Sequence, residues 1–86
     1  MPTTNITLTT TWTKLADAGD TYFLIGAADS DQWECATTAA DAPPTVDWGH
    51  RLGGMSQSVS RDLIGGGYVW GRAIGGYTAV RMAVTK

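Results

Sequence analysis

The chain has 86 residues, a formal net charge of −2 and only 16% charged residues, compared with about 25% in an average soluble domain. This length supports one domain, residues 1–86, because two domains could not each hold a core. The acidic balance argues against nucleic-acid binding, which needs basic side chains to neutralise phosphates. We find no signal peptide and no run of about 18 apolar residues, so we expect synthesis in a cytosol and no membrane partner.

So short a chain gains only a thin stability margin from its own core, and small domains usually add disulfides, a metal or a partner. Cys35 is the only cysteine and His50 the only histidine, which excludes an internal disulfide and leaves no zinc-type ligand spacing. Asp29, Asp31 and Glu34 lack the spacing of a calcium loop. We therefore predict no metal and no other cofactor, and expect stabilisation by oligomerisation or by docking on a larger assembly.

The first half of the chain has a hydrophobic period of two residues. Apolar residues alternate with threonine over 6–12, which predicts a half-buried strand. The apolar run 21–25, ended by Gly26, is typical of a strand covered on both faces, and 32–37 alternates again. The segment 39–47 contains Pro43 and Pro44, which cannot pair in a central strand, so we predict a long surface loop there.

The second half predicts more short strands. Residues 49–52 and 55–61 form two weaker ones, and the only candidate helix, 60–64, is stopped by three glycines. Strands 68–73 and 77–85 are predicted to form a hairpin across Gly75 and Gly76. Seven or eight short strands indicate an all-β fold, either a small antiparallel β-sandwich or a jelly-roll-like barrel. We expect the following side chains inside: Ile6, Leu8, Phe23, Val69, Val80, Met82 and Val84.

The patterns of common catalytic sites are missing. A nucleophilic triad needs a histidine base beside a nucleophile, but His50 stands between Gly49 and Arg51, and no serine lies in a G-x-S-x-G elbow. The glycines at 65–67 do not extend to a phosphate-binding pattern, because Trp70 stands where that pattern needs glycine. We therefore predict that the protein binds a partner and is not an enzyme.

Four tryptophans are the unusual feature of the composition. Tryptophan combines a large apolar area with a polar edge, which suits interfaces and sugar-stacking platforms. Trp12, Trp33 and Trp70 lie in alternating strands, and we interpret them as core residues. Trp48 ends the proline-containing loop, so we predict contact with a partner through the segment 39–51. Its contact residues would be Pro43, Pro44, Trp48, His50 and Arg51, with Arg51 pairing with an acid from the first half of another chain.

Several segments together resemble small structural proteins of tailed bacteriophages, which decorate capsids or form part of fibres. These segments are NITL at 5–8, WTKLAD at 12–17, APP at 42–44, GHRL at 49–52 and GYVWGRA at 67–73. The resemblance spans most of the chain and lies in its threonine-rich strands and glycine turns. It implies a virion protein without catalytic residues, present in many symmetric copies and often trimeric.

Two functions follow as expectations. The first is a phage virion structural protein, either a capsid decoration (cement) protein or a head-fibre type domain, acting as a homotrimer bound to capsid or fibre proteins. The second is a carbohydrate- or receptor-binding module of a tail fibre or other adhesin, in which exposed aromatic rings stack on a glycan.

Overall fold

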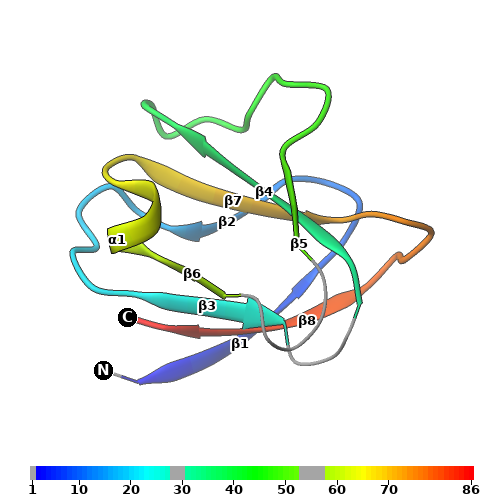
Figure 1. Ribbon diagram of the computed structural model, residues 1–86, viewed down its shortest axis with the longest axis horizontal. Helices are drawn as coiled ribbons and strands as arrows, with labels where there is room; N and C mark the ends of the chain where they lie inside the picture. The colour runs from blue at the N-terminus through cyan, green and yellow to red at the C-terminus, as the bar shows by residue number, and fades with distance from the viewer. Residues whose placement is uncertain (1, 28–30, 53–57) are drawn as a thin grey trace.

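The computed structural model describes residues 2–27, 31–52 and 58–86, which form two four-stranded antiparallel sheets (Figure 1). Sheet A has the order β1 (Thr3–Leu8), β8 (Val80–Thr85), β3 (Leu24–Ala27) and β6 (Ser58–Ser60). Sheet B has the order β2 (Thr13–Ala16), β7 (Tyr68–Ala73), β4 (Trp33–Thr38) and β5 (His50–Leu52). A single turn of helix, α1 (Arg61–Ile64), follows β6, and no helix in the described ranges is long and apolar enough to cross a membrane.

The strand pairs are nested. β1 pairs with β8, β2 with β7, β3 with β6 and β4 with β5, each antiparallel, and successive pairs alternate between the two sheets. This is the arrangement of one long antiparallel hairpin rolled around a core, which is the jelly-roll topology. The prediction of an all-β sandwich of seven or eight short strands is confirmed.

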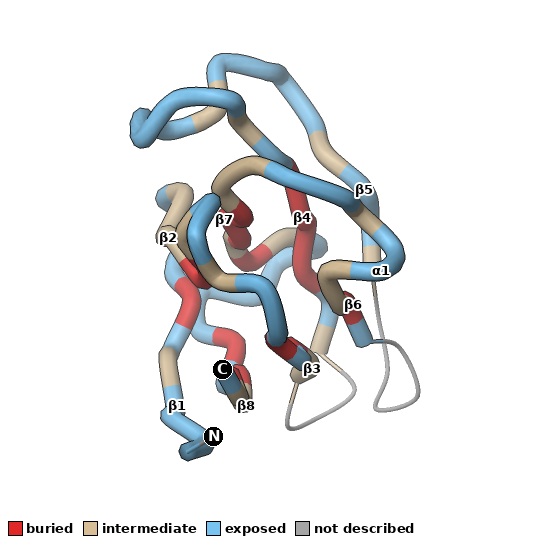
Figure 2. The backbone as a smooth tube through the Cα atoms, turned by 90° about the vertical axis from the view of Figure 1, so that its left-hand side faces the viewer, coloured by how far each residue is buried: buried red, intermediate tan, exposed pale blue. Residues whose placement is uncertain are grey.

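The core lies between the sheets, as the buried segments in Figure 2 show. It is built from the alternate residues of each strand, because successive side chains of a strand point to opposite faces. Six of the seven predicted core residues are buried, namely Leu8, Phe23, Val69, Val80, Met82 and Val84. Ile6 packs against the core but is only half-buried, since β1 is the edge of sheet A.

The predicted hairpin between 68–73 and 77–85 is wrong. The glycine turn is present, because Tyr77 N donates to Ile74 O at 3.2 Å and Gly75 and Gly76 have φ values of 68° and 89°. However, β7 lies in sheet B and β8 in sheet A. The turn therefore carries the chain from one sheet to the other instead of folding it back on its neighbour.

Two strand predictions also need correction. The alternation over 6–12 does not form one strand, because β1 ends at Leu8 and the chain crosses to sheet B before β2 begins at Thr13. The run 21–25 is not covered on both faces, since Leu24 is 54% exposed. Of the predicted strand 55–61, β6 accounts for 58–60, and 55–57 lie outside the described residues.

Candidate functional site

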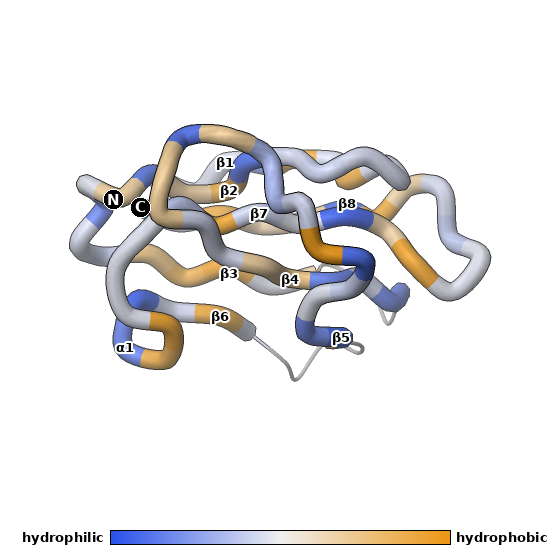
Figure 3. Tube along the Cα trace, turned by 90° about the horizontal axis from the view of Figure 1, so that it is seen from above, coloured by the Kyte–Doolittle hydropathy of each residue, from blue (hydrophilic) through white to orange (hydrophobic). Residues whose placement is uncertain are grey.

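The outer face of sheet B carries outward-facing side chains that are buried beneath a loop. Val69, Gly71 and Ala73 of β7 face the core, and a Cβ on Gly71 would lie 2.9 Å from Leu15 Cδ1. The alternating residues Trp70 and Arg72 therefore face outward, as does Glu34 of β4. Trp70 and Glu34 are nevertheless buried, at 7% and 2% exposure. The segment 39–49, called the cover loop below, lies over this face (Figure 3).

The cover loop is attached to sheet B at three points. Lys14 Nζ donates to Asp41 Oδ1 and Oδ2 at 3.0 and 3.1 Å. Arg72 Nη2 donates to Asp47 O at 2.7 Å. At Gly49 the backbone passes so close that a Cβ would lie 2.5 Å from Cys35 O and 3.2 Å from Trp12 Cη2, a distance that only glycine permits. The loop is thus fixed at its start, near its end and where it enters β5.

Arg72 connects this loop to a buried carboxylate. Its Nε donates to Glu34 Oε2 at 2.7 Å, and its guanidinium stacks on the Trp12 ring at 4.3 Å from the centroid. Arg51 Nε lies 3.9 Å from Glu34 Oε1, but its side chain is 76% exposed. Arg72 is therefore the main counter-ion of Glu34, and the same guanidinium holds the Asp47 carbonyl.

The attached loop presents apolar side chains to solvent. Trp48 is 71% exposed and Val46 is 51% exposed. Both line an open depression of about 430 Å³, together with Thr45 and Asp47. An exposed aromatic side chain beside a concave surface with a few polar groups is typical of a binding site, so this surface is the candidate binding site.

The structure brings the five predicted contact residues to the cover loop and the adjoining edge strand β5. Pro43 is exposed and Pro44 half-buried in the loop, and His50 and Arg51 are exposed in β5. Within the chain Arg51 lies beside an acid of the first half, Glu34. Its pairing with an acid of another chain stays a prediction.

Two tryptophans lie elsewhere than the sequence suggested. Trp33 is fully buried in the core, as predicted. Trp12 and Trp70 instead belong to the outer face of sheet B, where Trp70 Nε1 donates to Thr38 Oγ1 at 2.8 Å and Trp12 stacks on Arg72. Trp12 lies against Gly49 of the cover loop, and neither side chain fills the space between the sheets.

Two titratable groups near the loop, Lys14 and Cys35, have raised pKa values. Lys14 Nζ lies 2.8 Å from Asp17 Oδ1, and its hydrogen bonds to Asp17 and Asp41 raise the pKa of Lys14, so the amine stays charged. Burial raises the pKa of the Cys35 thiol to about 11, so the thiol is protonated and unreactive at neutral pH. Among the residues described, no three His, Cys, Asp or Glu side chains form a metal-binding group; Asp29, considered above for calcium, lies outside those residues.

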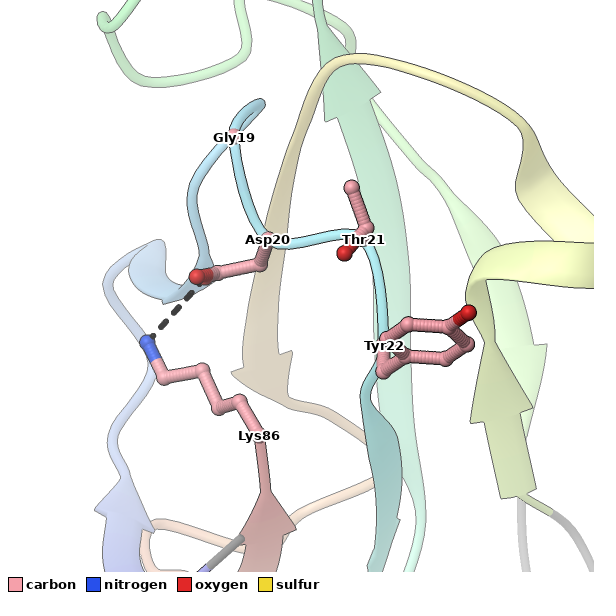
Figure 4. Close-up of a pocket in the computed structure, with 5 residues that line it drawn as sticks. All are labelled: Gly19, Asp20, Thr21, Tyr22 and Lys86. Carbon is pink, nitrogen blue, oxygen red and sulfur yellow. Dashed lines mark ion pairs between the residues drawn. The ribbon is translucent and has the colours of Figure 1, made fainter.

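A second depression, of about 220 Å³, lies beside the turn before β3 (Figure 4). Lys86 Nζ is 3.4 Å from Asp20 Oδ2, and Asp17 N donates to the same carboxylate at 2.8 Å. The hydrogen bond from Asp17 N, followed by the charge of Lys86, lowers the pKa of Asp20. Tyr22, at 73% exposure, is the aromatic side chain among the residues that line this depression.

The same turn is held by Arg61, a residue that sequence reasoning did not single out. Arg61 donates to four carbonyl oxygens: Nη2 to Asp17, Nε to Asp20, and Nη1 to Gly65 and Gly67, at 2.6–3.0 Å. Its guanidinium also lies 4.7 Å from the centroid of the Phe23 ring. The polar groups around the second depression therefore serve the fold, which leaves the cover loop as the stronger candidate site.

Comparison with protein-family models, with curated proteins and with solved structures finds no match to this chain.

Proposed function

We propose that the protein is a virion structural component of a tailed phage that attaches to a capsid or fibre protein through the cover loop and β5. The observation that carries this proposal is the exposure of Trp48 on a loop attached to the sheet beneath it. Tryptophan, tyrosine and arginine are the residues most enriched at the energetic centres of protein interfaces. Trp48 and Arg51 lie in this one segment, separated by two residues.

The attachment of the loop supports binding. A partner that binds a mobile loop must offset the entropy of ordering it, and a loop already fixed avoids that cost. Here Asp41, Asp47 and Gly49 are each held to sheet B. Trp48 is therefore presented in a defined position before the partner arrives.

The fold and the sequence resemblance support the phage context. Jelly rolls of eight strands occur in viral capsid domains and also in lectins. A fold alone does not assign a function, so the phage assignment depends on the segments that resemble phage decoration and fibre proteins. Localisation in the virion and the homotrimer belong to the same proposal.

A glycan-binding module is the second candidate. The depression beside Trp48 is also lined by Thr45 and Asp47, and an aromatic ring flanked by hydroxyl and carboxylate groups suits a sugar, which offers an apolar face and hydroxyls. A reproducible signal on a glycan array that is lost in Trp48→Ala favours this function.

The experiment for the first function compares capsid binding by the wild type and two variants. Purified capsids of the encoding phage, assembled without this protein, are mixed with each form and sedimented. Trp48→Ala should weaken binding by about 30-fold or more, the effect of losing an interface hot spot of about 2 kcal/mol. Tyr22→Ala removes an equally exposed aromatic side chain at the second depression and should bind as the wild type does.

Neither substitution is expected to unfold the protein, since replacing an exposed side chain usually changes the free energy of unfolding by no more than about 0.5 kcal/mol. Wild-type protein that does not bind capsids, or a Trp48→Ala variant that binds as tightly as Tyr22→Ala, contradicts the proposal.

A further inference from the structure

The four edge strands of the two sheets differ in how they are protected. An edge strand presents unpaired backbone N–H and C=O groups, and proteins protect such edges by shortening them, charging them or bulging them. β5 and β6 have three residues each, and β5 carries Arg51. β2 has four residues, carries Lys14, and its register with β7 shifts between Lys14 and Ala16.

β1 has none of these protections. It is six residues long, its register with β8 is continuous from Thr3 to Leu8, and no charged side chain precedes Lys14 in the sequence. Threonine and isoleucine, which favour strands, make up most of it. In the described part of the chain no strand pairs with the outer side of β1.

A half-buried apolar side chain and a depression accompany this open edge. Ile6 points toward the core but is only half-buried, and a depression of about 150 Å³ lies beside it, lined by Asn5, Ile6, Thr7, Arg81 and Met82. A strand added at this edge would satisfy the backbone groups of β1 and cover Ile6 at the same time.

We propose that β1 pairs antiparallel with β1 of a second copy of this chain around a two-fold axis, joining the two A sheets into one sheet of eight strands. A second copy fits because β1 is uncharged and therefore meets itself without repulsion between like charges. A contact of the same strand with itself is isologous, and it closes at two subunits.

The period of the strand sets the register of this contact. Residues directly opposite each other must share a face, and Thr4, Ile6 and Leu8 face the interior. Placing Ile6 opposite the partner's Ile6 buries both half-exposed side chains and pairs Thr4 with the partner's Leu8. Shifting the register so that Asn5 meets the partner's Asn5 would place Pro2 opposite Leu8, and proline has no N–H to donate.

The contact does not involve the surface proposed for capsid attachment, but it competes with the proposed homotrimer, because a two-fold contact closes at two subunits. β1 and β2 form one side of the sandwich, and β5 and β6 form the other (Figure 2). Pairing through β1 therefore leaves β5 and the end of the cover loop of both copies on the outside of the dimer, so the two surfaces can be tested separately.

The first test measures mass by light scattering over a range of concentrations. The wild type should approach twice the 9.1 kDa chain mass. Ile6→Lys and Ile6→Glu should each be monomeric, because like charges would then face each other across the axis, and an equimolar mixture of the two should regain the dimer. Ser58→Lys, on the opposite edge of sheet A, should remain dimeric.

The second test reads the register. Ile6→Cys should form an intermolecular disulfide on mild oxidation, since opposed residues on neighbouring strands bring their Cβ atoms to about 4.5–5.5 Å. Thr7→Cys, which faces the partner's Asn5, should crosslink only when mixed with Asn5→Cys. The native Cys35 is buried and should not contribute.

Three results overturn the inference. These are a wild type that stays monomeric up to its solubility limit, a mixture of the folded Lys and Glu variants that stays monomeric, and a trimer whose mass the Ile6 variants do not change. Capsid binding that depends on Trp48 is unaffected by any of them, so failure of the dimer and failure of the proposed capsid attachment are distinguishable.

Discussion

Replacing Arg72 with methionine tests whether the ion pair beneath the cover loop is a major source of stability. The carboxylate of Glu34 has a side-chain exposure of only 3% and a 2.7 Å contact with Arg72. Removing the partner of a buried charge costs about 3–5 kcal/mol. Arg51 cannot replace the lost charge, because an exposed pair such as the 3.9 Å contact to Glu34 contributes about 0–1 kcal/mol.

This loss is large for so small a domain. At about 0.05–0.15 kcal/mol per residue, 86 residues give a total stability of roughly 4–13 kcal/mol. Arg72→Met is therefore expected to shift the urea midpoint far downward, measured by far-ultraviolet circular dichroism so that loss of the Trp12 stacking does not distort the signal.

The matched control is the double variant Glu34→Met/Arg72→Met. Replacing both members of a buried pair with apolar residues of similar volume is often close to neutral, so the double variant should lose no more than about 2 kcal/mol and be more stable than Arg72→Met alone. An Arg72→Met cost under about 1 kcal/mol, or a double variant less stable than either single one, would refute this account of the pair.

Three further predictions concern the fold. Arg61→Ala removes hydrogen bonds to four carbonyls and should lower the free energy of unfolding by about 2–3 kcal/mol in urea titration; an unchanged midpoint contradicts this. Gly71→Ala places a methyl group 2.9 Å from Leu15 Cδ1 and should cost about 1–3 kcal/mol, seen as a lower thermal midpoint, whereas Gly19→Ala meets no atom within 4 Å and should not. Burial raises the pKa of Cys35 to about 11, above the unfolded value of about 8.5, so its contribution to stability is complete below pH 8.5 and is lost as pH rises toward 11; iodoacetamide labelling of native protein at pH 8, followed by mass spectrometry, should show no adduct.

The sequence predicted what depends on local pattern. Alternation identified the inward positions of β8, and the two prolines identified the cover loop. The sheet to which each strand belongs could not be read this way, because Gly75 and Gly76 make a turn whether the next strand pairs with β7 or leaves for the other sheet.

The tryptophan positions show a similar limit. Trp70 lies in an alternating strand and is interpreted as core, although the alternation that places Val69 inside places Trp70 outside. Trp70 is buried on the outer face, where its Nε1 donates to Thr38 Oγ1. Arg72 and Glu34 gave no recognisable signal, since an arginine and an acid 38 residues apart become partners only when β7 and β4 are paired.

The position of β8 has a consequence for how the protein folds. β8 lies between β1 and β3 in sheet A, with Thr3 opposite Thr85. β1 and β3 therefore have no common partner until β8 pairs with them. The contact between the Thr3 and Thr85 hydroxyl groups joins residues 82 positions apart. Chains dominated by such distant pairings fold slowly, in milliseconds to seconds. During synthesis the uncharged β1 is made before its partner β8 and stays unpaired until β8 is complete, so β1 is exposed to premature association with another chain.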